Sequence, residues 1–202
     1  MVSKKFEVLF DVGGPNSYLV HKILPRFCAE HDAEAELTPI LLGGLFKATG
    51  NRAPMIRYAD APAKLAYENL EFQRFIKTNN LTQFRMNPHF PVNSLLCMRV
   101  LTGARRAGVL LSATDALMAG MWEDGLDLGK AEVVAECLTA AGLDGAALAA
   151  SAEDPDVKAE LVATTEKAVE RGAFGVPTFF VGTEMFWGKE RLPQVAAELA
   201  KG

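Results

Sequence analysis

Cysteine is scarce in this sequence. Its three cysteines, Cys28, Cys97 and Cys137, are far apart and form no Cys-x-x-Cys pair. A structural disulfide, a zinc site and dithiol redox chemistry are therefore not expected, because each needs thiols at paired positions. Each cysteine stands among apolar residues in a segment with helical character, where a buried and unreactive thiol is the usual outcome. We predict that the protein has no metal site.

The sequence also lacks an excess of charge of one sign. It contains 21 Lys and Arg against 25 Asp and Glu, a net charge of −4, and the basic residues are scattered. This argues against nucleic acid or an anionic membrane as a partner. No apolar run approaches membrane-spanning length, and residues 1–5 lead into a strand pattern without the apolar core of a signal peptide. We expect a soluble, cytoplasmic protein that binds a small neutral or anionic ligand.

Hydrophobic residues make up 50% of the 202 residues, enough to bury a substantial core. The N-terminal part predicts a βαβ unit. Its first strand is expected at 6–10 and its second at 35–42. Between them, a helix is predicted from Asn16, with Pro15 at the first helical position, where proline is favoured. His21, on this helix, is expected at the surface.

Beyond the second strand, the pattern becomes helical. Because one βαβ unit cannot cover both faces of its sheet, these helices predict an insertion between two halves of an α/β domain. The chain then returns through a helix at 155–171 to a hairpin and a C-terminal helix. We therefore predict the α/β class, with a thioredoxin-like domain over 1–42 and 155–202 and an all-helical insertion over 43–154. Helices of the insertion are predicted at 64–77, 93–107, 113–123, 130–141 and 145–150.

The most informative stretch is Gly172–Gly182, which reads GAFGVPTFFVG. An apolar run that begins with proline and ends in a turn predicts the first strand of a hairpin. In a thioredoxin-like domain, a Val-Pro bond at this position is commonly cis, and it leaves neighbouring amides free. We therefore predict a cis bond between Val176 and Pro177, with the Val176 backbone pairing with a thiol peptide. The alternative is an ordinary proline at the start of a strand.

The reactive group of a thioredoxin-like domain lies where the first strand turns into the first helix. Unpaired amides and the positive end of the helix dipole stabilise an anion there. In this chain the position is occupied by Gly13–Ser17, which contains no cysteine. The amides of Asn16 and Ser17 and the Ser17 hydroxyl are candidate donors to a thiolate supplied by a ligand. The alternative is a plain helix start.

A family resemblance follows from these motifs. The segment Phe10–Leu19, FDVGGPNSYL, resembles the Phe-Asp-x-x-Ser-Pro-x-Ser-Tyr-Leu opening of the 2-hydroxychromene-2-carboxylate isomerase and kappa-class glutathione transferase family, which has a DsbA-like fold. The resemblance covers nearly the whole chain. Each motif is weak to moderate alone, but their order and spacing are specific. They recur at Thr49–Pro54, His89–Pro91, Phe174–Pro177 and Trp187–Leu192.

The resemblance implies a glutathione site. By it, Asn51 and Lys64 would contact the glycine end of glutathione, and the Val176 backbone, beside Pro177, would pair with its cysteine moiety. An ammonium group suits the glycyl carboxylate chemically. For Lys64 the alternative is a surface lysine on a helix, because its spacing from Asn51 is longer than the family suggests.

One further pair of residues is implied in the same way. Lys189 and Glu190 would hold the γ-glutamyl end, since a carboxylate can bind its α-amino group. Independently of the resemblance, His89 lies in a proline-rich and therefore rigid loop that could face a ligand, and His89, Phe90 and Pro91 are the expected substrate pocket.

The sequence departs from the family at Gly14, where the family commonly has a serine that donates a hydrogen bond to the glutathione sulfur. Gly14 cannot donate one, so Gly14, Asn16 and Ser17 together are the expected catalytic positions, with the helix-start amides and Ser17 stabilising the thiolate. The resemblance implies a glutathione-dependent isomerase of 2-hydroxychromene-2-carboxylate-like acids in aromatic degradation, with glutathione as its cofactor.

Two alternatives stay open at this point. One is a kappa-like glutathione transferase, in which the same thiolate attacks an electrophile and the adduct is released. The other is a glutathione-binding protein without catalysis, which the missing serine favours. The resemblance also implies a homodimer and a small aromatic or electrophilic substrate, whose identity the helical insertion does not reveal.

Overall fold

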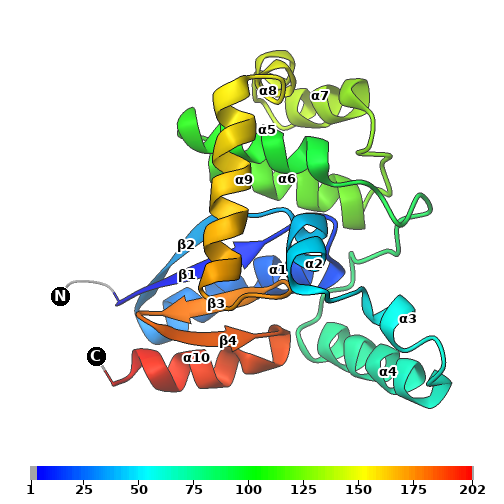
Figure 1. The fold of residues 1–202 in the computed structure, drawn as a ribbon, viewed down its shortest axis with the longest axis vertical. Helices are drawn as coiled ribbons and strands as arrows, with labels where there is room; N and C mark the ends of the chain where they lie inside the picture. Colours follow the sequence, from blue (N-terminus) through cyan, green and yellow to red (C-terminus); the bar gives the residue numbers. More distant parts are fainter. Residues whose placement is uncertain (1–3, 202) are drawn as a thin grey trace.

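The two ends of the chain meet in one four-stranded sheet, as the α/β pattern predicts. The computed structural model describes residues 4–201 (Figure 1), so the expected domain limits at residues 1 and 202 lie outside the described residues. The strands are β1 (Lys4–Phe10), β2 (Ala33–Pro39), β3 (Thr178–Val181) and β4 (Glu184–Trp187). Their order is β2-β1-β3-β4. β1 is parallel to β2, and β3 is antiparallel to both β1 and β4.

Alternating side chains of the sheet pack against two pairs of helices. On one face, Val8 and Phe179 form a core cluster with α1 (Pro15–His31) and α10 (Leu192–Leu199), which follows the short 3₁₀ helix η1 (Lys189–Arg191). On the other face, Leu9 and Phe180 form a cluster with α2 (Leu42–Thr49) and α9 (Pro155–Glu170). Successive residues of a strand point to opposite faces, so these apolar runs are buried on both sides.

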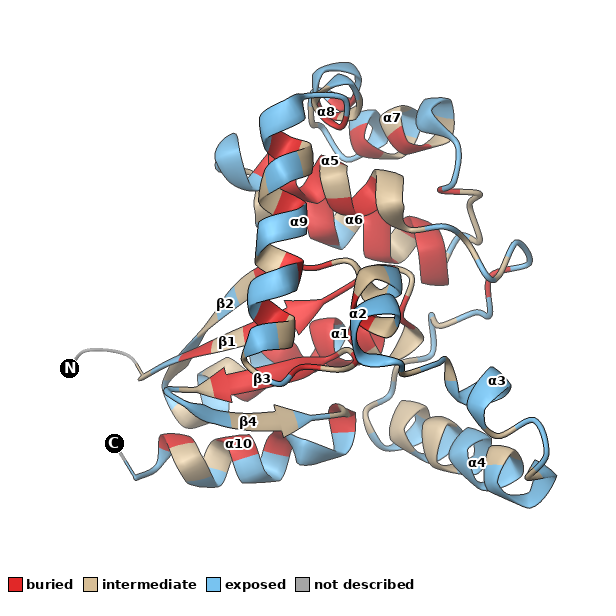
Figure 2. Cartoon of the chain, in the orientation of Figure 1, coloured by how far each residue is buried: buried red, intermediate tan, exposed pale blue. Residues whose placement is uncertain are grey.

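The helices of the middle segment share a core with the α/β part. The largest buried cluster contains residues of α5 to α8 together with Phe10, Val12, Tyr18 and Leu19. The Trp122 Nε1–H donates to the Val12 carbonyl oxygen at 2.8 Å and joins the two parts directly. Figure 2 shows the buried faces of α5 and α6 above the sheet. These helices are α5 (Leu95–Arg106), α6 (Leu110–Trp122), α7 (Ala131–Ala140) and α8 (Gly145–Ser151).

Two other helices form an arm that projects from the sheet (Figure 1). They are α3 (Pro54–Arg57) and α4 (Pro62–Thr78), and neither has a fully buried residue. Phe72, Phe75 and Ile76 of α4 pack in part against the main core. Across residues 4–201, no helix combines the length and the apolar character needed to cross a membrane.

The structure corrects the predicted elements in the region that follows β2. The second strand ends at Pro39, not at residue 42, because α2 begins at Leu42. Glycines lower helix propensity, and Gly43 and Gly44 weakened the helical signal of α2. A glycine at position 44 is explained by tertiary packing, because a Cβ atom there would come within 3.1 Å of the Thr165 methyl group of α9. The short helix α3 was also not predicted.

Candidate functional site

The start of α1 and the loop before β3 lie against each other, although they come from opposite ends of the chain. Gly14 is the N-cap residue of α1, with φ −93° and ψ 110°. A Cβ atom at Gly14 would come within 3.1 Å of the Val176 Cγ2 atom. The bond between Val176 and Pro177 is cis, as the sequence predicts. The structure thus brings Gly14, Val176 and Pro177 together.

The turn before α1 is held by a buried carboxylate. Asp11 is 0% exposed and accepts hydrogen bonds from the Gly13 amide (2.8 Å), the Leu42 amide (2.8 Å) and the Ser94 hydroxyl (2.9 Å). Burial raises the pKa of Asp11, and the three hydrogen bonds oppose that rise in part. Asp11 therefore joins the turn to the first residue of α2 and to the N-cap residue of α5. In the sequence it stood directly after the first predicted strand, within the Phe10–Leu19 motif, and nothing there indicated its partners.

Of the three hydrogen-bond donors expected to be free at the start of α1, one is already used within the protein. The Ser17 amide donates to the Gly14 carbonyl oxygen at 2.9 Å, so it is already used, and the prediction of a free Ser17 amide is wrong. Within residues 4–201, no described hydrogen bond uses the Asn16 amide. The Ser17 hydroxyl, which is 2% exposed, and the Asn16 Oδ1 atom are buried without a partner among these residues.

The unpartnered Ser17 hydroxyl faces the position that a side chain at residue 14 would occupy. The distance from the Ser17 Oγ atom to a Cβ built on Gly14 is 3.3 Å. Buried polar groups in folded proteins nearly always have a partner, because an unmade hydrogen bond is costly. The Ser17 hydroxyl is therefore one candidate donor to an anion at the start of α1, and the Asn16 amide is a second.

The protein's own thiols do not supply this anion. Cys28, Cys97 and Cys137 are all free, and burial raises the pKa of each thiol. A raised pKa keeps a thiol protonated and unreactive. A thiolate at the start of α1 would have to come from a ligand.

Asn51 is held next to the Val176 loop. Its Nδ2–H donates to the Phe174 carbonyl oxygen at 2.8 Å, and its Oδ1 accepts from the Arg57 Nη1–H at 3.0 Å. Lys64 is exposed, with its ammonium 3.9 Å from the centre of the Tyr58 ring. The described contacts thus place Asn51 beside the loop and do not join Lys64 to it. The sequence analysis missed Arg57, although the short spacing from Asn51 was a usable signal.

Lys189 and Glu190 follow directly after the cis-proline region. The Gly188 amide donates to the Pro177 carbonyl oxygen at 3.0 Å, which fixes the start of η1. Lys189 is 5% exposed, forms an ion pair with Glu190 and lies 5.4 Å from the centre of the Phe75 ring of α4. Both residues line a groove of about 650 Å³ between α1, α4 and α10. The ion pair therefore forms part of the groove wall.

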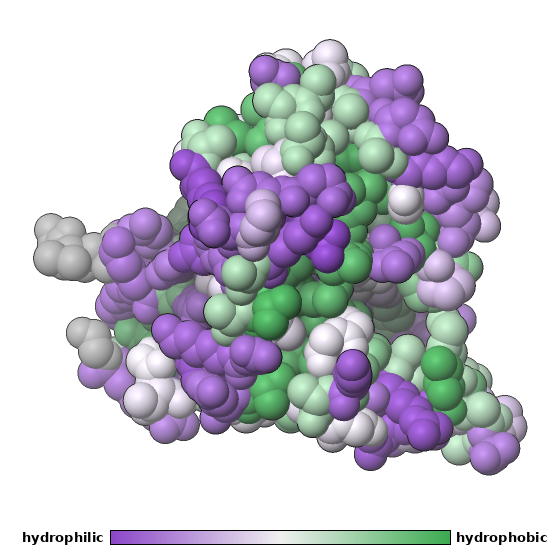
Figure 3. All heavy atoms as spheres, turned by 45° about the horizontal axis from the view of Figure 1, so that its top comes forward, coloured by the Kyte–Doolittle hydropathy of each residue, from purple (hydrophilic) through white to green (hydrophobic). Residues whose placement is uncertain are grey.

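The space-filling view shows a second concave region. In Figure 3, the surface is hollowed between the helical part and the α3–α4 arm, and hydrophobic atoms lie in its depth. The arm carries Lys64 and Arg57, and Asn51 precedes it.

The loop expected to form the substrate pocket is anchored to the helical part. The Asn87 side chain is buried and donates to the carbonyl oxygens of Met121 (2.8 Å) and Leu126 (2.9 Å). Phe90 packs on Trp122 with ring centres 5.9 Å apart, and the bond between Phe90 and Pro91 is cis. His89 is exposed. No described contact joins this loop to Gly14 or Val176.

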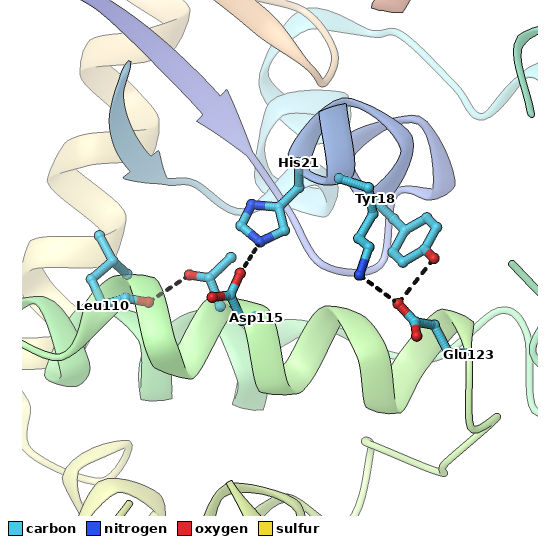
Figure 4. A network of polar contacts seen from close by, with 7 residues as sticks. Tyr18, His21, Leu110, Asp115 and Glu123 are labelled. Carbon is cyan, nitrogen blue, oxygen red and sulfur yellow. Dashed lines mark hydrogen bonds and ion pairs between the residues drawn. The ribbon is translucent and has the colours of Figure 1, made fainter. Parts of the chain in front are cut away.

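Two carboxylates contact the first turns of α1 (Figure 4): Asp115 of α6 and Glu123, the C-cap residue of that helix. Glu123 accepts from the Tyr18 hydroxyl at 3.0 Å and pairs with the Lys22 ammonium at 3.0 Å. The Asp115 Oδ1 atom lies 2.6 Å from the His21 Nε2 atom. Burial, followed by the Glu123 charge, raises the pKa of Tyr18, which keeps its phenol protonated. His21 is 8% exposed, so the prediction that it lies at the surface is wrong.

Comparison with known proteins gives concordant results. The family model for the DSBA-like thioredoxin domain matches residues 6–200. The 2-hydroxychromene-2-carboxylate isomerase of Pseudomonas sp. (strain C18) is 27% identical over 186 residues, 91% of this chain and 84% of the relative. Glutathione S-transferase kappa 1 of Homo sapiens is 26% identical over 212 residues, with 94% and 88% covered.

Solved structures give the same fold. A structure of 2-hydroxychromene-2-carboxylate isomerase superposes with a TM-score of 0.77 at 24% identity, covering 98% of this chain and 95% of the other. At this identity the similarity establishes the fold alone.

Proposed function

The chain belongs to the DSBA-like thioredoxin domain family, and on that premise we propose that it is a glutathione-dependent isomerase of a 2-hydroxychromene-2-carboxylate-like acid. Its relatives are isomerases and glutathione transferases. The observation that carries the proposal is the buried, unpartnered Ser17 hydroxyl beside Gly14 and Val176. Because an orphaned donor at a helix start fits an anion, the donor set suits a thiolate in place of a cysteine of the chain itself.

Each part of the proposed site has one task. The Asn16 amide and the Ser17 hydroxyl hold the sulfur of glutathione, and the Val176 backbone orients its cysteine moiety. Asn51 lies at the glycyl end, with Lys64 expected near it. Lys189 and Glu190 take the γ-glutamyl end, where the existing ion pair matches a zwitterionic amino acid group. When bound, glutathione would supply a thiolate that adds to a conjugated carbon and later leaves, which permits rotation about the former double bond.

Calorimetric titration with glutathione, followed by turnover with glutathione at catalytic amounts, tests this proposal. We expect saturable binding and many turnovers per glutathione, because an isomerase regenerates its cofactor. Absence of binding would refute the proposal.

The kappa-type relative supports a second candidate, a glutathione transferase. In that case one glutathione is consumed for each product formed, so the stoichiometry of turnover separates the two enzymes. A small aromatic or electrophilic compound is the proposed substrate for either, with the loop of His89, Phe90 and Pro91 as its pocket. The homodimeric and cytoplasmic state implied by the resemblance is proposed with it, and sedimentation and cell fractionation test it.

Gly14 supports a third candidate, a glutathione-binding protein without catalysis. The backbone of Gly14 is in an extended conformation that any residue can adopt. A Cβ atom there would lie 3.1 Å from Val176 Cγ2 and 3.3 Å from both the Asp11 carbonyl oxygen and Ser17 Oγ, so Gly14→Ser requires shifts of a few tenths of an ångström in these neighbours. If the natural protein binds glutathione without turnover and Gly14→Ser gains isomerase activity, the binder is the correct description.

A further inference from the structure

One cationic side chain near the proposed site has no assigned task. Arg57, the last residue of α3, donates from Nη1 to the Asn51 Oδ1 atom at 3.0 Å. Asn51 in turn donates to the Phe174 carbonyl oxygen, two residues before Val176. Arg57 is thus joined through one side chain to the loop whose backbone is proposed to pair with the thiol peptide.

The position of Arg57 relative to Asn51 is fixed locally. The Arg57 amide donates to the Ala53 carbonyl oxygen at 2.9 Å, and the Tyr58 amide donates to the Pro54 carbonyl oxygen at 2.9 Å. These bonds close a tight helical turn directly after Asn51. These bonds fix the backbone of Arg57, and the hydrogen bond to Asn51 Oδ1 then places the guanidinium beside Asn51.

Most hydrogen-bond donors of the Arg57 guanidinium are not used by described contacts within the protein. It carries five N–H groups in a planar fork, and among residues 4–201 its described partner is Asn51. Arg57 is exposed, so the remaining donors are open to a ligand. A guanidinium binds a carboxylate through two parallel hydrogen bonds, which gives both strength and direction.

Lys64, the cation that the family resemblance implies, is engaged differently. Its ammonium lies 3.9 Å from the centre of the Tyr58 ring, and no described contact links it to Asn51. We infer that Arg57, acting with Asn51, binds the C-terminal carboxylate of the thiol peptide and makes the site selective for thiol peptides that end in a free carboxylate. This inference rests on the proposed function, and it moves the carboxylate contact from Lys64 to Arg57.

The test compares two ligands that differ in this carboxylate. Calorimetry measures the binding of glutathione and of its glycyl monoethyl ester to the full-length protein and to Arg57→Ala, Lys64→Ala and Arg52→Ala. Arg52 is the matched control, since it is an exposed arginine of the same segment with no described partner. Circular dichroism checks that each variant is folded.

The natural protein is expected to bind glutathione about tenfold or more tightly than the ester, the effect of one charge-assisted contact. Arg57→Ala should bind both ligands equally, at the affinity of the ester. Lys64→Ala and Arg52→Ala should keep the preference for glutathione.

Two results would overturn the inference while the proposed function stands: an unchanged preference in Arg57→Ala, or loss of the preference in Lys64→Ala alone. If the natural protein binds neither ligand, the proposed function fails, and this inference fails with it.

Discussion

At the scale of single residues, Gly14 and Ser17 act as one feature of the α1 start. A Cβ atom at residue 14 would lie 3.1 Å from Val176 Cγ2 and 3.3 Å from Ser17 Oγ, so the three residues are close neighbours. Ser17 is buried and has no described partner. Because buried hydroxyls nearly always have a hydrogen-bond partner, the Ser17 hydroxyl is the donor that we propose for the ligand sulfur.

Replacement of Ser17 tests this feature. In Ser17→Ala, the thiol pKa of bound glutathione should rise by roughly one to two units, because a hydrogen bond to a charged group contributes about 1.5–3 kcal/mol. The fold should persist, since the hydroxyl has no described partner. Ultraviolet absorbance of the bound thiolate across pH measures the change.

Thr139→Ala provides the control, because its hydroxyl bonds the Ala135 carbonyl oxygen of the distant helix α7. Identical titration curves for the natural protein and Ser17→Ala would show that Ser17 does not contact the sulfur.

At the scale of elements, three carboxylates position α1. Asp11 orders the turn before it, while Glu123, the C-cap residue of α6, and Asp115 of α6 hold Tyr18 and His21 in its first turns. The start of a helix can present its amides to a ligand only if the helix itself is fixed. These contacts therefore link the helical part of the molecule to the geometry of the proposed thiolate site.

The pH dependence of stability should report on Asp11. Burial raises the pKa of folded Asp11 above its ordinary value of 3.8. As pH rises from about 4 through the folded pKa, the unfolded chain releases this proton before the folded one does. The contribution of Asp11 to the free energy of unfolding therefore falls with rising pH, opposite to an exposed ion-paired carboxylate.

The Asp11→Asn variant tests whether the contribution of Asp11 to the free energy of unfolding falls as pH rises. At low pH the variant should be about 1–3 kcal/mol less stable than the natural protein, because its amide NH₂ opposes the Leu42 amide or leaves it unpaired. The difference should shrink as pH rises. Urea unfolding at several pH values measures it, with Asp60→Asn, at an exposed carboxyl, as the control for lost charge. A difference that grows with pH would contradict the burial argument.

At the scale of the whole molecule, the helical insertion is not an independent unit. Phe10, Val12, Tyr18 and Leu19 of the α/β part lie in the same buried cluster as α5 to α8. Removing the insertion would expose these side chains to water, at roughly 1.5–3 kcal/mol for each large one. The proposed division into 1–42 with 155–202 and 43–154 therefore describes the order of the chain and not separate folding units.

A single cooperative unfolding transition is the expected consequence. The chain has two tryptophans, of which Trp122 is fully buried in the helical part and Trp187 is 45% exposed at the edge of the sheet. In Trp122→Phe and in Trp187→Phe, the remaining tryptophan reports on one part. Its fluorescence transition in urea should coincide with the circular dichroism transition of the same variant. Separate midpoints would show that the parts unfold independently.

Local patterns were sufficient to predict much of this molecule. Apolar runs in strands and helical periodicity depend on neighbouring residues, so the thioredoxin-like class and the helices from α4 onward could be predicted from the sequence. The cis bond at Val176–Pro177 followed from that class, whereas the cis bond at Phe90–Pro91 was not predicted. Gly14 and Ser17 were also found in this way, because a turn followed by a proline marks the start of a helix.

The remaining features depend on distances between segments far apart in the chain. The burial of Asp11 among three donors, the pairing of His21 with Asp115 and the contact of Arg57 with Asn51 beside Phe174 arise when strands and helices pack. A charged residue in a sequence has no visible partner, and its burial follows from elements that meet only in the fold. The tertiary structure therefore decides which polar residues support the site and which stay open to a ligand.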